Sequence, residues 1–190
     1  MSASSTVFDQ PANLLGALSL RIADEISAAV GPAAGGSDST AAALSAMLHF
    51  LDAPSVDLLG RVLGLTSSGT VRLVDGLVRA GLAERGSGRD RRSTAVRLTR
   101  EGRAAAERVA AARATVLAGA LAVLQPAERS AFAHLAGKVL AGLIRPPGAS
   151  RWTCRLCDTE VCGRPAGRCP VANAAVARHG GGPAPTVAGT

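Results

Sequence analysis

The sequence contains few aromatic residues, a single lysine and no apolar run long enough to cross a membrane. Phe, Trp and Tyr together make up 2% of the 190 residues, so a hydrophobic core has to be built from Leu, Val, Ile and Ala. Such small side chains suit closely packed helices. No stretch reaches the ~18 consecutive apolar residues of a membrane span, and the first residues lack the pattern of a secretion signal. These absences predict a cytoplasmic protein with no membrane partner.

Patterns of catalytic residues are also missing. No nucleophile, histidine and acid occur in a recognisable catalytic pattern, and the sequence has no glycine-rich phosphate-binding loop. His49, His134 and His179 are scattered along the chain and have no carboxylate cluster at metal-ligand spacing beside them. We therefore expect a protein that is not an enzyme.

Positive charge is abundant and concentrated in one segment. The formal net charge is +7, and Lys138 is the only lysine among 21 basic residues. From Ser55 to Arg103, ten arginines stand against five acidic residues. Coding bias would explain the arginine and alanine richness but not this clustering. Because arginine binds phosphates and base edges well, the segment predicts a polyanionic partner such as DNA.

Apolar residues recur at helical spacing along most of the chain. This spacing predicts helices over about 13–30, 40–51, 56–62, 66–80, 99–124 and 126–145, with Gly31 and Pro32 stopping the first. Ser39 or Thr40 is expected to cap the second helix, and Thr66 or Ser67 the fourth. Residues 82–85 and 94–98 alternate as strands do and flank a polar, glycine-rich tip. The expected fold is mostly α with a small β-hairpin wing.

Two short helices, a capped helix and a basic hairpin occur here in the order of a winged helix-turn-helix. We expect Val71, Val74, Leu77 and Val78 to face inward on the capped helix. The side chains then predicted to reach the major groove are Ser67, Ser68, Thr70 and Arg72. Arg89, Arg91 and Arg92 at the hairpin tip are predicted to contact the minor groove or phosphates. The alternative is a small helical domain with a solvated basic hairpin.

The same segment resembles the MarR family of bacterial regulators. Residues 73–85 are similar to the family's recognition helix running into its wing, residues 88–93 to its Asp-x-Arg wing signature, and residues 96–103 to the second wing strand and the following helix. The resemblance implies an obligate homodimer joined by the first and last two helices, a palindromic operator and a small-molecule effector. It also implies that Asp90 pairs with wing arginines and leaves Arg92 to enter the minor groove. Gly69 and Gly76 depart from a strong helix, each costing ~1 kcal/mol relative to Ala.

Four cysteines follow the last predicted helix of this domain. Cys154, Cys157, Cys162 and Cys169 are spaced C-x2-C-x4-C-x6-C within 16 residues. In a cytosolic protein such clustering favours metal ligation over disulfides. A tetrahedral Zn²⁺ site, an iron–sulfur cluster and thiol or disulfide chemistry all stay open, and neighbouring arginines would offset thiolate charge.

These patterns divide the chain into a flexible arm (1–12), a winged-helix domain (13–145), a cysteine segment (151–172) and a disordered tail (173–190). Within the domain we expect dimerisation helices over 13–30 and 100–145 and a DNA-binding core over 40–99. The predicted function is that of a homodimeric transcriptional regulator that binds double-stranded DNA and responds to a ligand, a metal or redox state. The alternative is a sensor or protein-interaction module that works mainly through its four-cysteine tail.

Overall fold

The computed structural model describes residues 9–87, 94–144 and 149–180. Within them the chain forms helices joined by short loops and one two-stranded hairpin. The helices are α1 (Gln10–Ala34), α2 (Asp38–His49), α3 (Val56–Leu63), α4 (Ser67–Arg79), α5 (Arg100–Leu121), α6 (Pro126–Leu143), α7 (Ala149–Thr153) and α8 (Pro170–His179). The strands β1 (Ala83–Ser87) and β2 (Thr94–Leu98) pair antiparallel. The predicted fold class, mostly α with a β-hairpin wing, is confirmed.

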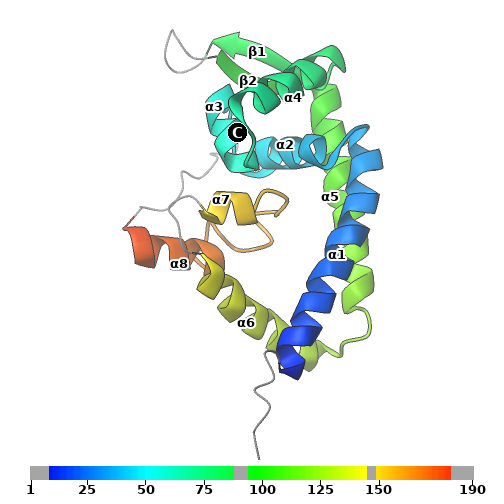
Figure 1. Cartoon of the computed structure of the whole chain (residues 1–190), viewed down its shortest axis with the longest axis vertical. Helices are drawn as coiled ribbons and strands as arrows, with labels where there is room; N and C mark the ends of the chain where they lie inside the picture. Colours follow the sequence, from blue (N-terminus) through cyan, green and yellow to red (C-terminus); the bar gives the residue numbers. More distant parts are fainter. Residues whose placement is uncertain (1–8, 88–93, 145–148, 181–190) are drawn as a thin grey trace, which may run out of the picture.

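The helices are arranged as a head on a long stem (Figure 1). We call α2, α3, α4 and the hairpin the head. The stem consists of α1 and α5, which lie side by side and contact α2. From the far end of the stem, α6 turns back towards the head, where α7 contacts α3 and α8 contacts α6. This path places α7 against α3 of the head.

Aliphatic side chains fill a single main core between the head and the upper part of the stem. Leu44, Leu59, Leu77, Val96 and Val109 are all at most 2% exposed and come from five different elements. Small residues let these elements approach closely. A Cβ added at Gly102 of α5 would collide with the backbone of the loop before β1. The predicted Leu, Val, Ile and Ala core is confirmed.

Two predicted helix ends at the start of the chain are wrong. Pro32 does not stop α1, because a proline in the last turn removes a single hydrogen bond, and the helix continues to Ala34. It ends at Gly35, whose φ of 66° is the left-handed conformation that glycine adopts most easily. The cap of α2 is Ser37, whose side chain accepts from the N–H of Thr40, and not Ser39 or Thr40.

Other helix boundaries agree with the sequence. Thr66 caps α4 and Thr99 caps α5, each by a side-chain oxygen that accepts from a backbone N–H three residues later. Pro126 begins α6. The predicted disordered tail is wrong for residues 173–179, which are the body of α8. The rest of that tail, from residue 181 onward, lies outside the described residues.

Candidate nucleic-acid interface and cysteine cluster

Helix α4 is fixed to α3 by a close contact between small residues. A Cβ added at Gly60 of α3 would lie 2.5 Å from Oγ1 of Thr70 on α4, so the approach requires glycine. The hydroxyl of Thr70 donates to the carbonyl of Thr66 at 2.9 Å, and the N–H of Gly69 donates to Oγ1 of Thr66 at 3.2 Å. The start of α4 is therefore both capped and anchored.

Three of the four residues predicted to contact bases lie on the open side of α4. Ser67, Ser68 and Arg72 are exposed. Arg72 also borders an open cleft of about 470 Å³ between α4 and the start of α2. Hydroxyl and guanidinium groups are the donors and acceptors that suit base edges and phosphates. This face of α4 can therefore make sequence-dependent contacts with a duplex.

The prediction that Thr70 faces outward is wrong. Thr70, Val74 and Leu77 form the buried row of α4 and are 1%, 0% and 2% exposed. Val71 and Val78, which were predicted to face inward, are 43% and 37% exposed. Both rows have helical spacing and share Val74 and Leu77, so periodicity alone did not separate them.

Sequence reasoning consequently missed two valines on the outward face of α4. Val71 lies one turn after Ser67, on the same side of the helix as the exposed hydroxyls. Apolar groups at such positions contact the methyl group of thymine. The signal that could have set the helix phase is Gly60, since a glycine in α3 leaves room for a threonine facing it from α4.

The base of the wing is tied to α4 and to the loop before α3. Nη2 of Arg85 on β1 lies 2.7 Å from Oδ1 of Asp75 on α4. The N–H of Val96 on β2 donates to the carbonyl of Pro54 at 2.9 Å. The predicted tip residues Arg89, Asp90, Arg91 and Arg92 lie outside the described residues. The described part of the wing thus holds a fixed position beside α4.

The four cysteines come together below the head. Cys154 and Cys169 are 3% and 2% exposed and share a small buried cluster with Ile144 and Val171, against which Cys157 packs. Cys162 is exposed in the loop that follows. All four are free thiols. The structure therefore gathers the predicted ligand residues.

The thiols also perturb one another. A hydrogen bond from Cys157, more than any other influence, lowers the pKa of Cys154. Donating that bond raises the pKa of Cys157, and a hydrogen bond to Cys157 raises the pKa of Cys162. Among the described residues, no three Cys, His, Asp or Glu side chains already surround one point as a metal's ligands would. Binding a metal would require these thiols to lose their protons and exchange their mutual hydrogen bonds for metal bonds.

Comparison with known proteins finds similarity to one family, in sequence over part of the chain and in structure over most of it. Residues 35–93 match the model of the MarR family. A MarR family protein from Bacillus stearothermophilus is similar in structure, with a TM-score of 0.62 at 23% identity over 70% of this chain and 92% of that one. A MarR family transcriptional regulator from Silicibacter pomeroyi gives 0.53 at 28% identity over 68% and 89% of the chains.

A third similar structure contains nucleic acid. It is a mutant of MepR from S. aureus bound to an oligodeoxyribonucleotide, with a TM-score of 0.53 at 17% identity over 72% of this chain and 99% of that one. No curated protein matches the sequence.

No single helix in the described ranges has both the length and the apolar character of a membrane span. Taken together α5 and α6 pass such a test by length and composition, but they are bent by 114° at their junction.

Proposed function

We propose that this chain, whose residues 35–93 match the MarR family model and whose fold is that of MarR family proteins, is a winged helix-turn-helix regulator that binds a specific double-stranded DNA operator as a homodimer and regulates transcription there. The observation that carries this proposal is the exposed, capped start of α4 beside the wing. A structural relative bound to an oligodeoxyribonucleotide supports DNA as the ligand of this fold. Proteins of this family are generally DNA-binding proteins and not enzymes.

The charge of the head supports the same partner. Exposed arginines lie on α3, α4, β2 and the first turn of α5; they are Arg61, Arg72, Arg79, Arg97, Arg100 and Arg103. Neutralising phosphates with such groups releases counterions and makes DNA binding strongly dependent on salt. The exposed face of α4 would then lie in the major groove, with the wing beside it.

Two helices outside the head expose apolar side chains that suit a dimer interface. Leu14, Leu15 and Leu18 of α1 are 63%, 48% and 44% exposed. On α6, Phe132, Leu135, Val139 and Leu143 are 41% to 66% exposed. A single chain leaves these stripes in water, and a two-fold partner would bury them. The predicted dimerisation helices include both.

Selecting binding sites from a pool of random duplexes tests this function. We expect the selected sites to contain two inverted half-sites with centres ~10 bp apart, which is one turn of DNA. Light scattering on the bound complex should give two chains per duplex. Selection of no common sequence, or one chain per duplex, would overturn the proposal.

A second candidate function is the sensing of metal or redox state, and the gathering of four thiols below the head favours it. It does not compete with DNA binding, because the thiols and α4 lie in different parts of the chain. The small-molecule effector that the family resemblance implies stays a prediction.

A further inference from the structure

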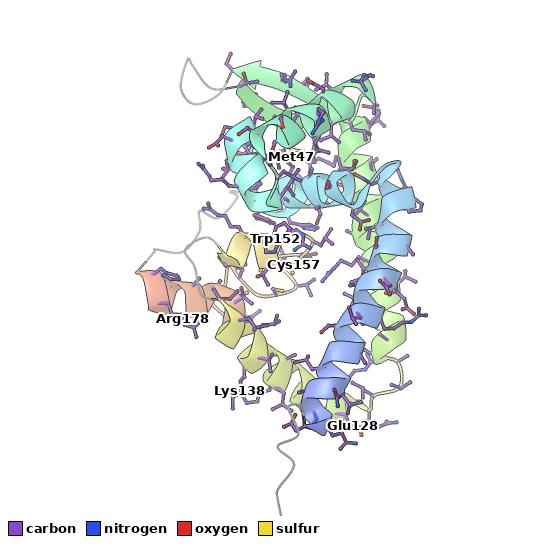
Figure 2. The ribbon with its side chains drawn as sticks, in the orientation of Figure 1. Met47, Glu128, Lys138, Trp152, Cys157 and Arg178 are labelled. Carbon is purple, nitrogen blue, oxygen red and sulfur yellow. The ribbon has the colours of Figure 1, made fainter. Side chains whose placement is uncertain are left out.

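Residues 149–180, which we call the cysteine module, pack directly against the head. Figure 2 shows Trp152 and Cys157 close beneath it. The indole of Trp152 lies against the last turn of α3, where a Cβ added at Gly64 would be 2.9 Å from Cζ3. Leu156 packs against the main core. The module, which follows α6 in the chain, therefore packs directly against the helix-turn-helix.

Polar contacts fix the same interface. Oγ1 of Thr159, a residue only 6% exposed, donates to the carbonyl of His49 at 2.9 Å. The guanidinium of Arg164 lies 5.8 Å from the ring centre of Phe50, the residue after α2. Nδ1 of His49 lies 4.0 Å from Oδ1 of Asp158, and burial at this contact lowers the pKa of His49. The contacts thus hold the loop between α2 and α3 and the end of α3.

The loops that carry the cysteines are built from tight turns. The N–H of Cys157 donates to the carbonyl of Cys154 at 2.9 Å, which closes the C-x2-C turn. The carboxylate of Asp158 accepts from the N–H groups of Glu160 and Val161. The side chain of Asn173 on α8 donates to the carbonyl of Gly167 at 2.7 Å. These bonds bring Cys169 back to Cys154 in space.

Positive charge surrounds the thiols. Arg164 acts electrostatically on Cys154 and Cys162, and Arg113 of the stem acts on Cys157 and Cys162. Nε of Arg164 is buried and has no hydrogen-bond partner among the described residues. Four thiolates around a divalent cation carry a net charge of −2, which these arginines would offset. A buried net negative charge of this kind is otherwise costly.

We propose that Cys154, Cys157, Cys162 and Cys169 bind one thiolate-ligated metal centre per chain, and that the loaded module holds the end of α3 in the position that lets α4 bind DNA. Four thiols lose their protons to solvent as the metal binds, and no redox step is involved. The coupling to DNA rests on the function proposed above, whereas metal binding does not.

The position of the contact explains the coupling. Gly64 precedes the two-residue turn, Leu65 and Thr66, from which α4 begins. Loss of the indole from Gly64 would loosen this turn and lower the fraction of chains in which both α4 helices of a dimer fit DNA. Apparent affinity falls in proportion to that fraction.

Metal analysis of anaerobically purified, full-length protein tests the centre. Zinc at one equivalent per chain without visible absorption would identify a mononuclear zinc site. Iron with acid-labile sulfide and a brown colour would identify an iron–sulfur cluster. Either result supports the centre. Whichever metal is found, the Cys157→Ser and Cys162→Ser variants should lose it. Less than about half an equivalent of every metal in reduced wild-type protein would overturn it.

A docking variant separates the coupling from the ligation. Trp152→Ala leaves all four thiols in place, so we expect full metal content, a ~10-fold loss of affinity for the selected operator and faster hydrogen exchange of residues 59–66. Val161→Ala is the control, since Val161 is 84% exposed, and it should change nothing. Removing the metal from wild-type protein should cause the same loss of operator affinity and the same faster exchange of residues 59–66, and restoring the metal should reverse both.

The outcomes distinguish the two proposals. If no form of the protein binds DNA, the proposed function is wrong. Metal content and hydrogen exchange still test the metal centre and its contact with the head. Unchanged exchange at residues 59–66 after metal loss would overturn the coupling. Unchanged operator affinity in both Trp152→Ala and metal-free protein would do the same.

Discussion

The head and the cysteine module are stabilised in different ways. Leu44, Leu59 and Leu77 are completely or almost completely buried in a core that also receives side chains from both stem helices. The buried cluster of the module consists of Cys154, Cys169 and Val171 together with Ile144 at the end of α6, and half of these residues are cysteines. Burial of apolar area contributes ~25 cal/mol per Å², so the small cluster contributes little. Burial is therefore sufficient for the head, whereas the module would need a further source of stability, which the proposed metal centre would supply.

The helices of the head and of the module also differ in how their N-termini are capped. In the head, α2, α3 and α4 begin at Ser37, Ser55 and Thr66, and each cap accepts from a backbone N–H. In the module, α8 begins at Cys169, which makes no side-chain cap hydrogen bond. The thiol of Cys169 is instead buried with that of Cys154. Local sequence thus specifies the head helices more strongly than α8.

Metal removal should produce the largest difference between the two regions. Structural zinc contributes ~10–16 kcal/mol of binding free energy in small zinc-dependent domains, which a cluster this small cannot replace. After chelation under reducing conditions, we expect the amides of residues 151–172 to exchange as in an unfolded chain, while those of residues 41–47 stay protected. Hydrogen exchange with mass spectrometry measures both. Equal protection of the module with and without metal would contradict the comparison.

Leu44→Ala should destabilise the head without changing any of the four cysteines of the module. Leu44 is 0% exposed in α2, so its truncation leaves a cavity and should lower the free energy of unfolding by ~2–5 kcal/mol. Leu20→Ala, at a side chain that is 71% exposed, is the matched control and should cost far less. Urea denaturation monitored by circular dichroism gives both values. Similar losses for the two variants would mean that the core has been assigned wrongly.

Arg72→Ala should relax base preference at one position of each half-site by ~1–3 kcal/mol. The control, Arg129→Ala, removes the same side chain from the first turn of α6, beside Glu128 at the far end of the stem (Figure 2). Titration of matched and singly altered operators by fluorescence anisotropy measures the change. Equal weakening on all sequences would make Arg72 a phosphate contact instead.

Two glycine variants should have small effects of opposite sign. Nothing lies within 4 Å of a Cβ added at Gly76 of α4, so Gly76→Ala should raise the free energy of unfolding by ~1 kcal/mol through helix propensity alone. Gly60→Ala should lower it, because the new Cβ meets Oγ1 of Thr70 at 2.5 Å. Thermal unfolding of the pair measures both. A stabilising Gly60→Ala would show that α3 and α4 are not in this close contact.

The sequence predicted the head well because its signals are local. Thr66, Thr99 and Pro126 each mark a helix start by their own chemistry, and strand alternation located the hairpin. The phase of α4 was wrong because Thr70, a polar residue, fills the space beside Gly60. That contact joins two helices and leaves no periodic trace in either one.

The surface of the head against which the cysteine module packs could not be predicted in the same way. Its contacts pair Trp152 with Gly64 and Thr159 with His49, positions that are far apart in the chain. The cysteine spacing indicated that the four thiols belong together, and the structure gathers them. No spacing rule indicated the surface on which they rest. The sequence predicts a disordered tail from residue 173, but residues 173–179 belong to α8, in which Arg178 donates to the carbonyl of Ile144.

The measurement that tests the central claim most directly is the affinity of the anaerobically purified, full-length protein for its selected palindrome relative to a scrambled duplex of equal length, at physiological salt. A specific regulator should bind the palindrome at least ~10³-fold more tightly, and its affinity should fall steeply as salt increases. Equal affinity for the two duplexes would contradict the account, because the exposed face of α4 would then carry no base recognition.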